Sequence, residues 1–290
     1  MPSVLAVDIG GSKLAAGVVS DAGEILRRVQ APTPAEGAAE PMFDVLRALI
    51  AEVLLGHEVA ACGVGCGGPM TPGGIAVSPL NIPAWRGFPL YDRLRDLTEL
   101  DVTIDNDAKA LALGEGWIGA ARGVRDFVAM VVSTGVGGGI VLDGRLLDGA
   151  LGNAGHIGHV IVRPDGALCA CGARGCLEAE ASGTGIRKRT GRPAELASGD
   201  EIELVGAAVG RAVASVCNLL DLRLAVVAGS VALGFGAPFF AAAQREVDAC
   251  ARLDFSAGAV IRPGGLGADG PLVGAAAVAW RALGLEGLPA

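Results

Sequence analysis

Aromatic and basic side chains are scarce in this sequence. Phe, Trp and Tyr together make up 4% of its 290 residues, and a single residue is tyrosine. Lys and Arg number 23 against 31 Asp and Glu, which gives a net charge of −8, and no basic run stands out. Because nucleic-acid phosphates are bound by clustered Lys and Arg, we expect no nucleic-acid partner.

A secretory signal is also missing. The chain opens with MPSVLAVDIGG, which has neither a basic n-region nor a cleavage site and predicts a cytoplasmic protein. The longest uncharged run, residues 224–243, approaches membrane-spanning length, but glycines and a proline interrupt it and flanking anchors are missing. We therefore expect no membrane partner and interpret this run as a buried strand, a glycine turn and a packed helix.

Small apolar residues, by contrast, are abundant. Hydrophobic residues make up 51% of the chain, and 46 residues are glycine, which is typical of a tightly packed globular protein. A length of 290 residues is long for a single core and suits two lobes.

The densest cluster of metal-binding side chains lies between Gly152 and Glu178, where the sequence reads GNAGHIGHVIVRPDGALCACGARGCLE. Four side chains spaced H-x9-C-x-C-x4-C suit a tetrahedral zinc ion: His159, Cys169, Cys171 and Cys176. A disulfide or buried free thiols are the alternative, but cytosolic cysteine clusters are more often metal sites. Four protein ligands leave no position for a catalytic water, so we expect a structural zinc that aims His156 and Glu178.

Two stretches share an unusual pattern of strand, glycine turn, strand, turn and strand. The first has its glycine turn at Asp8–Lys13 (DIGGSK), and the second, which begins at Phe127, has its turn at Ser133–Gly139 (STGVGGG). Two copies of one unit imply a duplicated domain. Backbone N–H groups in such turns can approach an anion closely, so both turns are candidate phosphate sites. The Gly229-Ser230 turn after another apolar run is a third.

Two familiar nucleotide motifs do not account for these turns. The Walker pattern G-x-x-x-x-G-K-[ST] is absent from both. Gly63–Gly68 matches G-x-G-x-x-G, but Pro69 follows where a dinucleotide-binding fold needs a helix, so we reject a Rossmann interpretation.

Asp107 is the candidate general base. It ends the run Asp105-Asn106-Asp107, which follows a predicted strand at residues 102–104 and precedes a predicted helix at residues 108–117. An Asp at such a junction is ordinarily a helix N-cap, and that alternative stays open at this point. Ligands of α/β sheets lie at strand ends of this kind, where a carboxylate can accept a hydroxyl proton as the oxygen attacks phosphorus.

Together these motifs resemble the ROK family of sugar kinases, named for repressors, open reading frames and kinases, within the actin-like ATPase superfamily. The matching strings are DIGGSK, NDA, STGVGGGI, GHIGH, CACGARGCLE and AGS, in the family's order over nearly the whole chain. The resemblance implies an α/β fold of two actin-like, ribonuclease H-like lobes with an interlobe cleft. We expect an N-terminal lobe at residues 1–115, onto which residues 275–290 pack, and a C-terminal lobe at residues 116–274 that carries the zinc loop.

The resemblance also implies ATP-dependent transfer of phosphate to the 6-hydroxyl of a sugar, with Asp107 as the base and Mg²⁺ bridging Asp8 to the phosphates. The implied sugar contacts are Gly68, Asn81, Asn106, Asp107, His156, His159 and Glu178. The implied nucleotide contacts are Asp8, Gly10, Gly11, Ser12, Lys13, Thr134, Gly135, Gly137, Gly138, Gly229 and Ser230. Dimers are usual in the family, so a homodimer is expected by analogy.

One position departs from the family's commonest pattern. Most members have Glu where this chain has His156, whereas bacterial N-acetylmannosamine kinases carry His there within the same GHIGH string. An imidazole can donate a hydrogen bond to an acetamido carbonyl, and a carboxylate can only accept one. The sequence therefore favours N-acetylmannosamine as the substrate.

Other interpretations stay open. A glucokinase or an N-acetylglucosamine kinase of the same family is the first alternative, and a non-catalytic sugar sensor is a remote one. Family repressors place a helix-turn-helix ahead of the kinase-like part, and the DIGG motif at residue 8 leaves no room for one.

Overall fold

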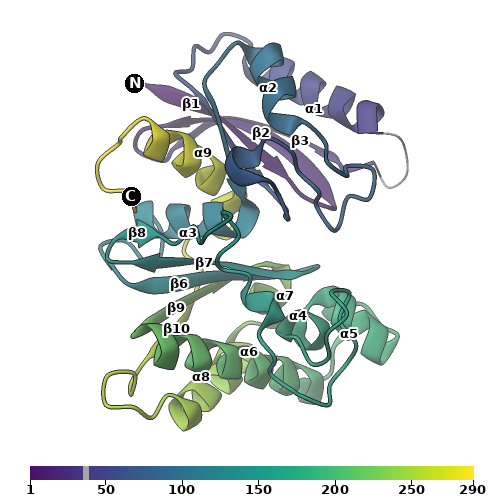
Figure 1. Ribbon diagram of the computed structural model, residues 1–290, viewed down its shortest axis with the longest axis vertical. Helices are drawn as coiled ribbons and strands as arrows, with labels where there is room; N and C mark the ends of the chain where they lie inside the picture. The colour runs from purple at the N-terminus through teal and green to yellow at the C-terminus, as the bar shows by residue number, and fades with distance from the viewer. Residues whose placement is uncertain (35–38) are drawn as a thin grey trace. The chain divides into compact units, whose positions relative to one another are not determined.

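The computed structural model describes residues 1–34 and 39–290, which fold into two compact α/β units (Figure 1). The first unit comprises Met1–Gly123, Leu146–Ala154 and Ala268–Ala290, and the second comprises Val124–Arg145 and Gly155–Gly267. The first unit is therefore assembled from stretches that are far apart in the sequence.

The two units contain five-stranded sheets of the same topology. Strand order is β3-β2-β1-β4-β5 in the first sheet and, read in the equivalent direction, β8-β7-β6-β9-β10 in the second. In each sheet an antiparallel pair, β1 with β2 or β6 with β7, is extended by parallel strands. The duplicated domain that the sequence predicts is thus confirmed.

The first sheet has a buried centre and an exposed edge. Its strands are β1 (Ser3–Ile9), β2 (Lys13–Ser20), β3 (Ile25–Pro32), β4 (Cys62–Cys66) and β5 (Val102–Asn106). Every residue of β1 is buried, as its continuous apolar run requires of a strand covered on both faces. The side chains of β3 alternate between half-buried and exposed, which suits a strand at the edge of the sheet.

Helices cover both faces of the first sheet. Figure 1 shows α1 (Ala39–Val53) and α2 (Leu90–Thr98) on one face and α3 (Asp107–Trp117) and α9 (Gly270–Ala282) on the other. Helix α9 approaches β4 so closely that a Cβ added to Gly63 would lie 2.0 Å from the Ala275 carbonyl oxygen. Helix α3 is buried from Ala108 to Trp117, so it is a central helix without a solvent-exposed face over this stretch. The short 3-10 turns η1 (Pro72–Gly74) and η4 (Gly267–Asp269) lie in connecting segments.

The second unit packs its longest helices against each other. Its strands are β6 (Phe127–Val132), β7 (Val136–Leu142), β8 (Arg145–Leu146), β9 (Leu224–Ala228) and β10 (Val260–Pro263). Its helices are α4 (Leu177–Ala181), α5 (Gly183–Thr190), α6 (Gly199–Leu220), α7 (Ser230–Phe235) and α8 (Ala237–Cys250), with 3-10 turns η2 (Ile157–His159) and η3 (Ala194–Leu196). Figure 1 shows α6 and α8 side by side on one face of this sheet.

The uncharged run at residues 224–243 folds as the sequence predicts, into strand β9, the turn at Gly229, helix α7 and the first half of α8. By length and composition alone, a different segment, α6, could cross a membrane, and it is the one helix of this kind in the described part of the chain. Its apolar face belongs to the core of the second unit and packs on α8, which is the position of a core helix.

Candidate active-site residues and metal centre

In the first unit, Asp8 lies near the carboxyl end of β1 and Asp107 directly follows β5, and these two parallel strands flank β4. Asp8 pairs with Gly65 of β4, and Gly65 pairs with Asp105 of β5. A Cβ built on Gly65 would lie 3.9 Å from Asp8 Oδ1 and 3.6 Å from the Asp107 Cα. The two acids therefore flank Gly65 at the carboxyl ends of the parallel strands, where α/β proteins bind ligands.

Asn106, and not Asp107, caps helix α3. The Asn106 side chain accepts hydrogen bonds from the backbone N–H of Ala108 (3.0 Å) and of Lys109 (3.4 Å). Asp107 is the first helical residue, and its Oδ1 accepts from Ala108 N at 2.9 Å. The N-cap alternative for Asp107 is therefore wrong. The side chain of Asp107 is exposed.

The pKa values of both acids are raised. Asp8 is buried, and desolvation, reinforced by the nearby charge of Asp107 and opposed by Lys13, raises its pKa from 3.8 to about 7. The pKa of Asp107 is also raised, because surrounding protein atoms desolvate it more than its backbone hydrogen bonds stabilise the carboxylate. Solvent still reaches the Asp107 side chain. A carboxylate with a raised pKa is a stronger base than an ordinary one.

The raised pKa of Asp8 predicts an unusual dependence of stability on pH. Between pH 3.8 and about 7 the folded protein holds a proton on Asp8 that the unfolded chain has released, so stability falls as pH rises through this range. Asp8→Asn removes this loss and should stabilise the ligand-free protein by up to about 4 kcal/mol near pH 8. Urea unfolding of both proteins should show little difference near pH 4.

Asp143→Asn is the matched control. The exposed Asp143 carboxyl has a pKa lowered by its hydrogen bond with Arg125, so its replacement should give no stability gain as pH rises. An Asp8→Asn difference that is the same at low and at high pH would contradict the shifted pKa of Asp8.

The first glycine turn is fixed by Thr33. Gly10 N donates to Lys13 O at 3.0 Å, and the Thr33 hydroxyl donates to Gly10 O at 2.7 Å. Thr33 N also donates to Ser12 O at 3.1 Å. Gly11 and Ser12 remain exposed at the tip of the turn, while Lys13 is half-buried. Their backbone is therefore held in shape while its tip stays open to a ligand.

Asn81 lies next to this turn. A Cβ added to Gly11 would lie 2.7 Å from the Asn81 Cβ. Leu80 N donates to Gly68 O at 3.2 Å, which places Gly68 beside the same loop, and Arg86 stiffens the loop by donating to Pro79 O at 2.6 Å. The structure thus gathers Gly68, Asn81 and the Gly10–Lys13 turn in one region.

No helix follows Gly68 directly. The chain runs through η1, and the next helix, α2, begins only at Leu90. The rejection of a Rossmann fold at Gly63–Gly68 is confirmed.

In the second unit, Ser133–Gly135 and Gly229-Ser230 lie together at the carboxyl ends of the parallel strands β6 and β9. Ser133 N donates to Gly135 O at 2.9 Å, and the Ser133 and Ser230 hydroxyls are 2.9 Å apart. Thr134 and Ser230 are exposed. Two of the three predicted phosphate turns are therefore neighbours in this unit.

Thr184 also lies against this turn, although no sequence motif indicated it. Its hydroxyl donates to Thr134 O at 2.9 Å, and Gly183 N donates to Ser133 O at 2.8 Å. These contacts bring the start of α5 against the turn. The available signal was the string Ser182-Gly183-Thr184, in which the Ser182 side chain caps α5 by accepting from Gly185 N at 3.0 Å.

Packing explains part of the glycine-rich string after Val136. Gly138 is buried, and a Cβ added to it would lie 2.9 Å from Ile157 Cγ2 and 3.2 Å from Gly155 O. Gly155 has φ +96, and a Cβ there would lie 2.4 Å from Gly138 O. These two glycines let the GHIGH segment lie directly on β7. Gly137 is half-buried on the same strand.

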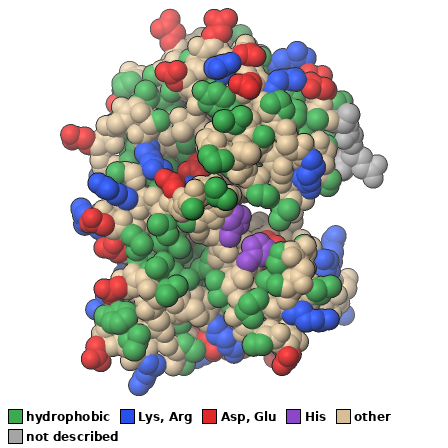
Figure 2. All heavy atoms as spheres, in the orientation of Figure 1, with side chains coloured by type: hydrophobic (Ala, Val, Ile, Leu, Met, Phe, Trp, Pro, Cys, Tyr) green, Lys and Arg blue, Asp and Glu red, His purple; other side chains and the backbone are tan. Residues whose placement is uncertain are grey.

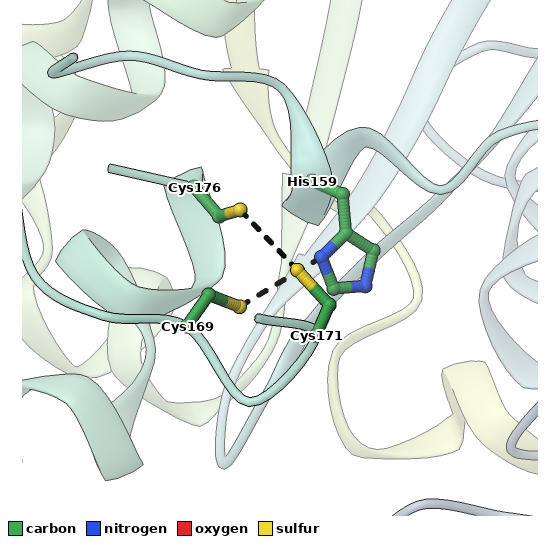
Figure 3. Close-up of side chains that lie close together, drawn as sticks. All are labelled: His159, Cys169, Cys171 and Cys176. Atoms are coloured by element: carbon green, nitrogen blue, oxygen red, sulfur yellow. Dashed lines mark hydrogen bonds between the residues drawn. The ribbon is translucent and has the colours of Figure 1, made fainter. Parts of the chain in front are cut away.

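The structure brings the four predicted metal ligands together, with sulfur and nitrogen atoms pointing toward one another (Figure 3). The ligand atoms of His159, Cys169, Cys171 and Cys176 all lie within 4.8 Å of one another. Cys171 Sγ is 3.6 Å from Cys176 Sγ, and Cys169 Sγ is 3.9 Å from His159 Nδ1. Tetrahedral zinc with Zn–S bonds of about 2.3 Å requires ligand separations of about 3.8 Å, so the set fits the ion.

The thiols of this cluster are free and differ in environment. All three cysteines are unbridged, so the disulfide alternative is wrong for the structure described here. A hydrogen bond from the Ala173 backbone lowers the pKa of the exposed Cys171, while burial raises the pKa of Cys176 to about 12. Metal binding, which favours thiolates, would remove the proton from both.

His156 and Glu178 lie at the two ends of the metal loop. The His156 ring is exposed, and its centroid is 6.1 Å from that of His159. Figure 2 shows histidine side chains, in purple, at the surface of the molecule. Glu178, two residues after Cys176, is half-buried and accepts from Val136 N at 3.1 Å. Both side chains therefore lie within three residues of a predicted metal ligand.

The fold of both units is that of the actin-like ATPases, and the sequence profile of the ROK family matches residues 4–282. The chain belongs to the ROK family. An N-acetylmannosamine kinase of Citrobacter koseri is 39% identical over 252 residues, which cover 81% of this chain and 85% of that protein.

Two glucokinases are also similar. That of Thermotoga maritima is 42% identical over 186 residues, 64% of this chain and 59% of that protein, so the match spans less than two thirds of its length. The structure of a ROK family glucokinase from Streptomyces griseus, in complex with glucose and AMPPNP, superposes with a TM-score of 0.83 at 31% identity and covers 94% of this chain and 98% of that one.

Proposed function

We propose that this protein is an ATP-dependent kinase that phosphorylates the 6-hydroxyl of N-acetylmannosamine. The observation that carries the proposal is the position of the His156 imidazole, which is exposed and lies beside His159, a predicted metal ligand. An imidazole N–H can donate to the acetamido carbonyl, which plain hexoses lack. The similarity to a protein named N-acetylmannosamine kinase over 81% of the chain supports the same substrate.

Asp107 acts as the general base in this proposal. Its carboxylate is exposed, and its Oδ1 is held by the N–H of Ala108. The raised pKa of Asp107 increases its affinity for the proton of the attacking hydroxyl. The carboxyl group is still ionised when the solution pH lies above its pKa. In phosphoryl transfer most of the acceleration comes from positioning and charge stabilisation, and the base completes it.

Asp8 and the glycine turns receive the nucleotide. The buried Asp8 carboxyl, with its pKa of about 7, would hold Mg²⁺, which neutralises charge on the phosphates when bound. Backbone N–H groups of Gly11, Ser12, Thr134, Gly135 and the Gly229-Ser230 turn would contact phosphate oxygens. The exposed tips at Gly11, Ser12 and Thr134 support this assignment.

The cluster of His159 and three cysteines holds a structural zinc ion in this proposal. Its four donors saturate a tetrahedral ion and leave no site for a reacting water. The ion ties the loop together, and the protein's own His156 and Glu178, carried at its ends, contact the sugar.

The identity of residue 156 should decide sugar preference. His156→Glu removes the donor for the acetamido carbonyl and supplies a carboxylate that accepts from plain sugar hydroxyls. We expect the ratio of kcat/KM for N-acetylmannosamine to that for glucose to fall by roughly 10- to 200-fold, the range that a single pocket contact provides. Coupled assays with both sugars measure it.

His57→Glu is the matched control, because this substitution makes the same chemical change. His57 follows α1 and is far from the metal loop in the sequence. It should leave the sugar ratio unaltered. An unchanged ratio in His156→Glu would remove His156 from substrate recognition.

A ROK glucokinase is the second candidate, favoured by the similarity to the Thermotoga and Streptomyces enzymes. Rates with N-acetylmannosamine, N-acetylglucosamine, glucose, mannose and fructose separate the two. Faster turnover of glucose than of N-acetylmannosamine by the wild-type protein would overturn our choice. No turnover of any sugar would leave the sugar-sensor alternative.

A homodimer and a cytoplasmic location stay predictions from the family resemblance and from the sequence. Light scattering at several protein concentrations tests the first of them.

A further inference from the structure

The Lys109 ammonium group is buried in the first unit and contacts three oxygen atoms. Its side chain is 3% exposed. It lies 3.0 Å from Asp105 Oδ1 and donates to Asp148 Oδ1 at 2.7 Å and to Gly152 O at 3.3 Å. An ammonium group has three N–H donors, so each of them has a partner. We call this set of four residues the Lys109 anchor.

The Lys109 anchor joins two segments that are distant in sequence. Lys109 and Asp105 belong to the junction of β5 and α3, which also carries Asp107. Asp148 and Gly152 belong to Leu146–Ala154, a segment that packs in the first unit although the chain before and after it belongs to the second. This segment leads directly into Gly155 and His156.

The segment is a compact turn closed on itself. Ala154 N donates to Asp148 O at 3.0 Å, and Asn153 Nδ2 donates to Leu151 O at 2.9 Å. Asp148 also faces Arg281 of α9, with Asp148 Oδ2 and the Arg281 guanidinium 3.6 Å apart. Lys109 is thus the buried contact of the turn, and Arg281 is the more exposed one.

Burial and the neighbouring charges act in opposite directions on the pKa values of the two acids of the anchor. Burial raises the pKa of Asp105, and Lys109 opposes that rise. For Asp148, partial burial acts to raise the pKa, but Lys109 and Arg281 together hold it below its ordinary value. A buried ion pair is weak evidence for a gain in stability, because desolvation offsets its attraction. Fixed geometry is therefore the better explanation for burying this lysine.

We propose that Lys109 is a positioning residue for sugar binding: it holds the turn of residues 148–154 and thereby limits the freedom of the adjoining His156. The inference rests on the proposed function, in which His156 contacts the sugar. It assigns no contact between Lys109 and the sugar or the nucleotide. The segment after the turn carries the recognition group, and the anchored turn reduces the entropy that this group loses on binding.

Asp148→Asn tests the proposal without leaving the buried Lys109 ammonium unpaired, because Asp105 Oδ1 still lies 3.0 Å from it. We expect the KM for N-acetylmannosamine to rise roughly three- to tenfold, the size of effect typical of a residue that acts through another. The KM for ATP and kcat should change by less than about twofold. Asp148→Glu, which retains the charge, should restore most of the sugar affinity.

Asp143→Asn is the matched control, since it removes an exposed aspartate that pairs with Arg125 elsewhere in the chain. It should leave both KM values unaltered. Equal sugar KM values in Asp148→Asn and Asp143→Asn would overturn the proposal, as would an equal rise of both KM values in Asp148→Asn.

Hydrogen exchange supplies a readout that does not depend on activity. The amide of Ala154, bonded to Asp148 O, should exchange faster in Asp148→Asn than in wild type, while amides of α3 stay protected. Unchanged exchange at Ala154 would refute the anchoring itself. If the wild-type protein phosphorylates no sugar, the proposed function fails, but exchange at Ala154 still decides whether the anchor holds the turn.

Discussion

Asp107→Asn should lower kcat by roughly 10²- to 10⁴-fold, the usual contribution of a positioned general base. Asparagine has nearly the same shape and can still accept from Ala108 N, and Asn106 still caps α3, so the fold should remain intact. The Kd for the sugar, measured by calorimetry, should change only a few-fold. Steady-state assays with N-acetylmannosamine and ATP measure the loss.

The pH profile gives an independent check of the same residue. A base works only when deprotonated, and the pKa of Asp107 is raised, so kcat/KM of the wild type should decline on the acid side at a higher pH than for an ordinary aspartate. The residual activity of Asp107→Asn should lack this acid limb. Asp143→Asn serves as the exposed control. Activity retained in Asp107→Asn would refute the base assignment.

Cys171→Ser should release the metal and loosen the loop that carries His156 and Glu178. Loss of an outer-shell partner alone weakens metal binding roughly 10- to 100-fold, so loss of a thiolate ligand should weaken zinc binding by at least about 100-fold. Because the Cys171 side chain is exposed, serine creates no cavity in the core. We expect a lower Tm and a higher sugar KM. Metal analysis by mass spectrometry should show zinc in wild type only.

Cys250→Ser is the control for this change, because Cys250 is also a free and exposed cysteine, near the end of α8. It should retain zinc, Tm and sugar affinity. Active wild-type protein purified without zinc would end the proposal of a structural metal.

Local sequence patterns were sufficient for much of the fold and for the grouping of the metal ligands. Continuous apolar runs predicted the buried strands, and the repeated strand and turn pattern predicted a duplicated domain, which the equal topology of the two sheets confirms. The cysteines could be predicted to converge because they are close in sequence and separated by glycines. Their Sγ atoms then need only a short loop to meet, as Cys171 and Cys176 do at 3.6 Å.

Contacts between distant segments could not be predicted in the same way. Thr184 hydrogen-bonds Thr134 across 50 residues of sequence, and no periodicity marks such a pair. No sequence pattern indicates the pairing of Lys109 with Asp148, which is 39 residues away. Capping was ambiguous for another reason: Asn106 and Asp107 are both good caps, and only the exact start of α3 decides between them.

The divided make-up of the first unit has a consequence for synthesis on the ribosome. Strands β1 and β4 are covered by α9, which is translated about 200 residues after β4, whereas the whole second unit lies within residues 124–267. Domains ordinarily mature in the order in which they emerge. In this protein the later-emerging unit can complete its core first, and the apolar face of the first sheet stays partly uncovered until α9 has been translated.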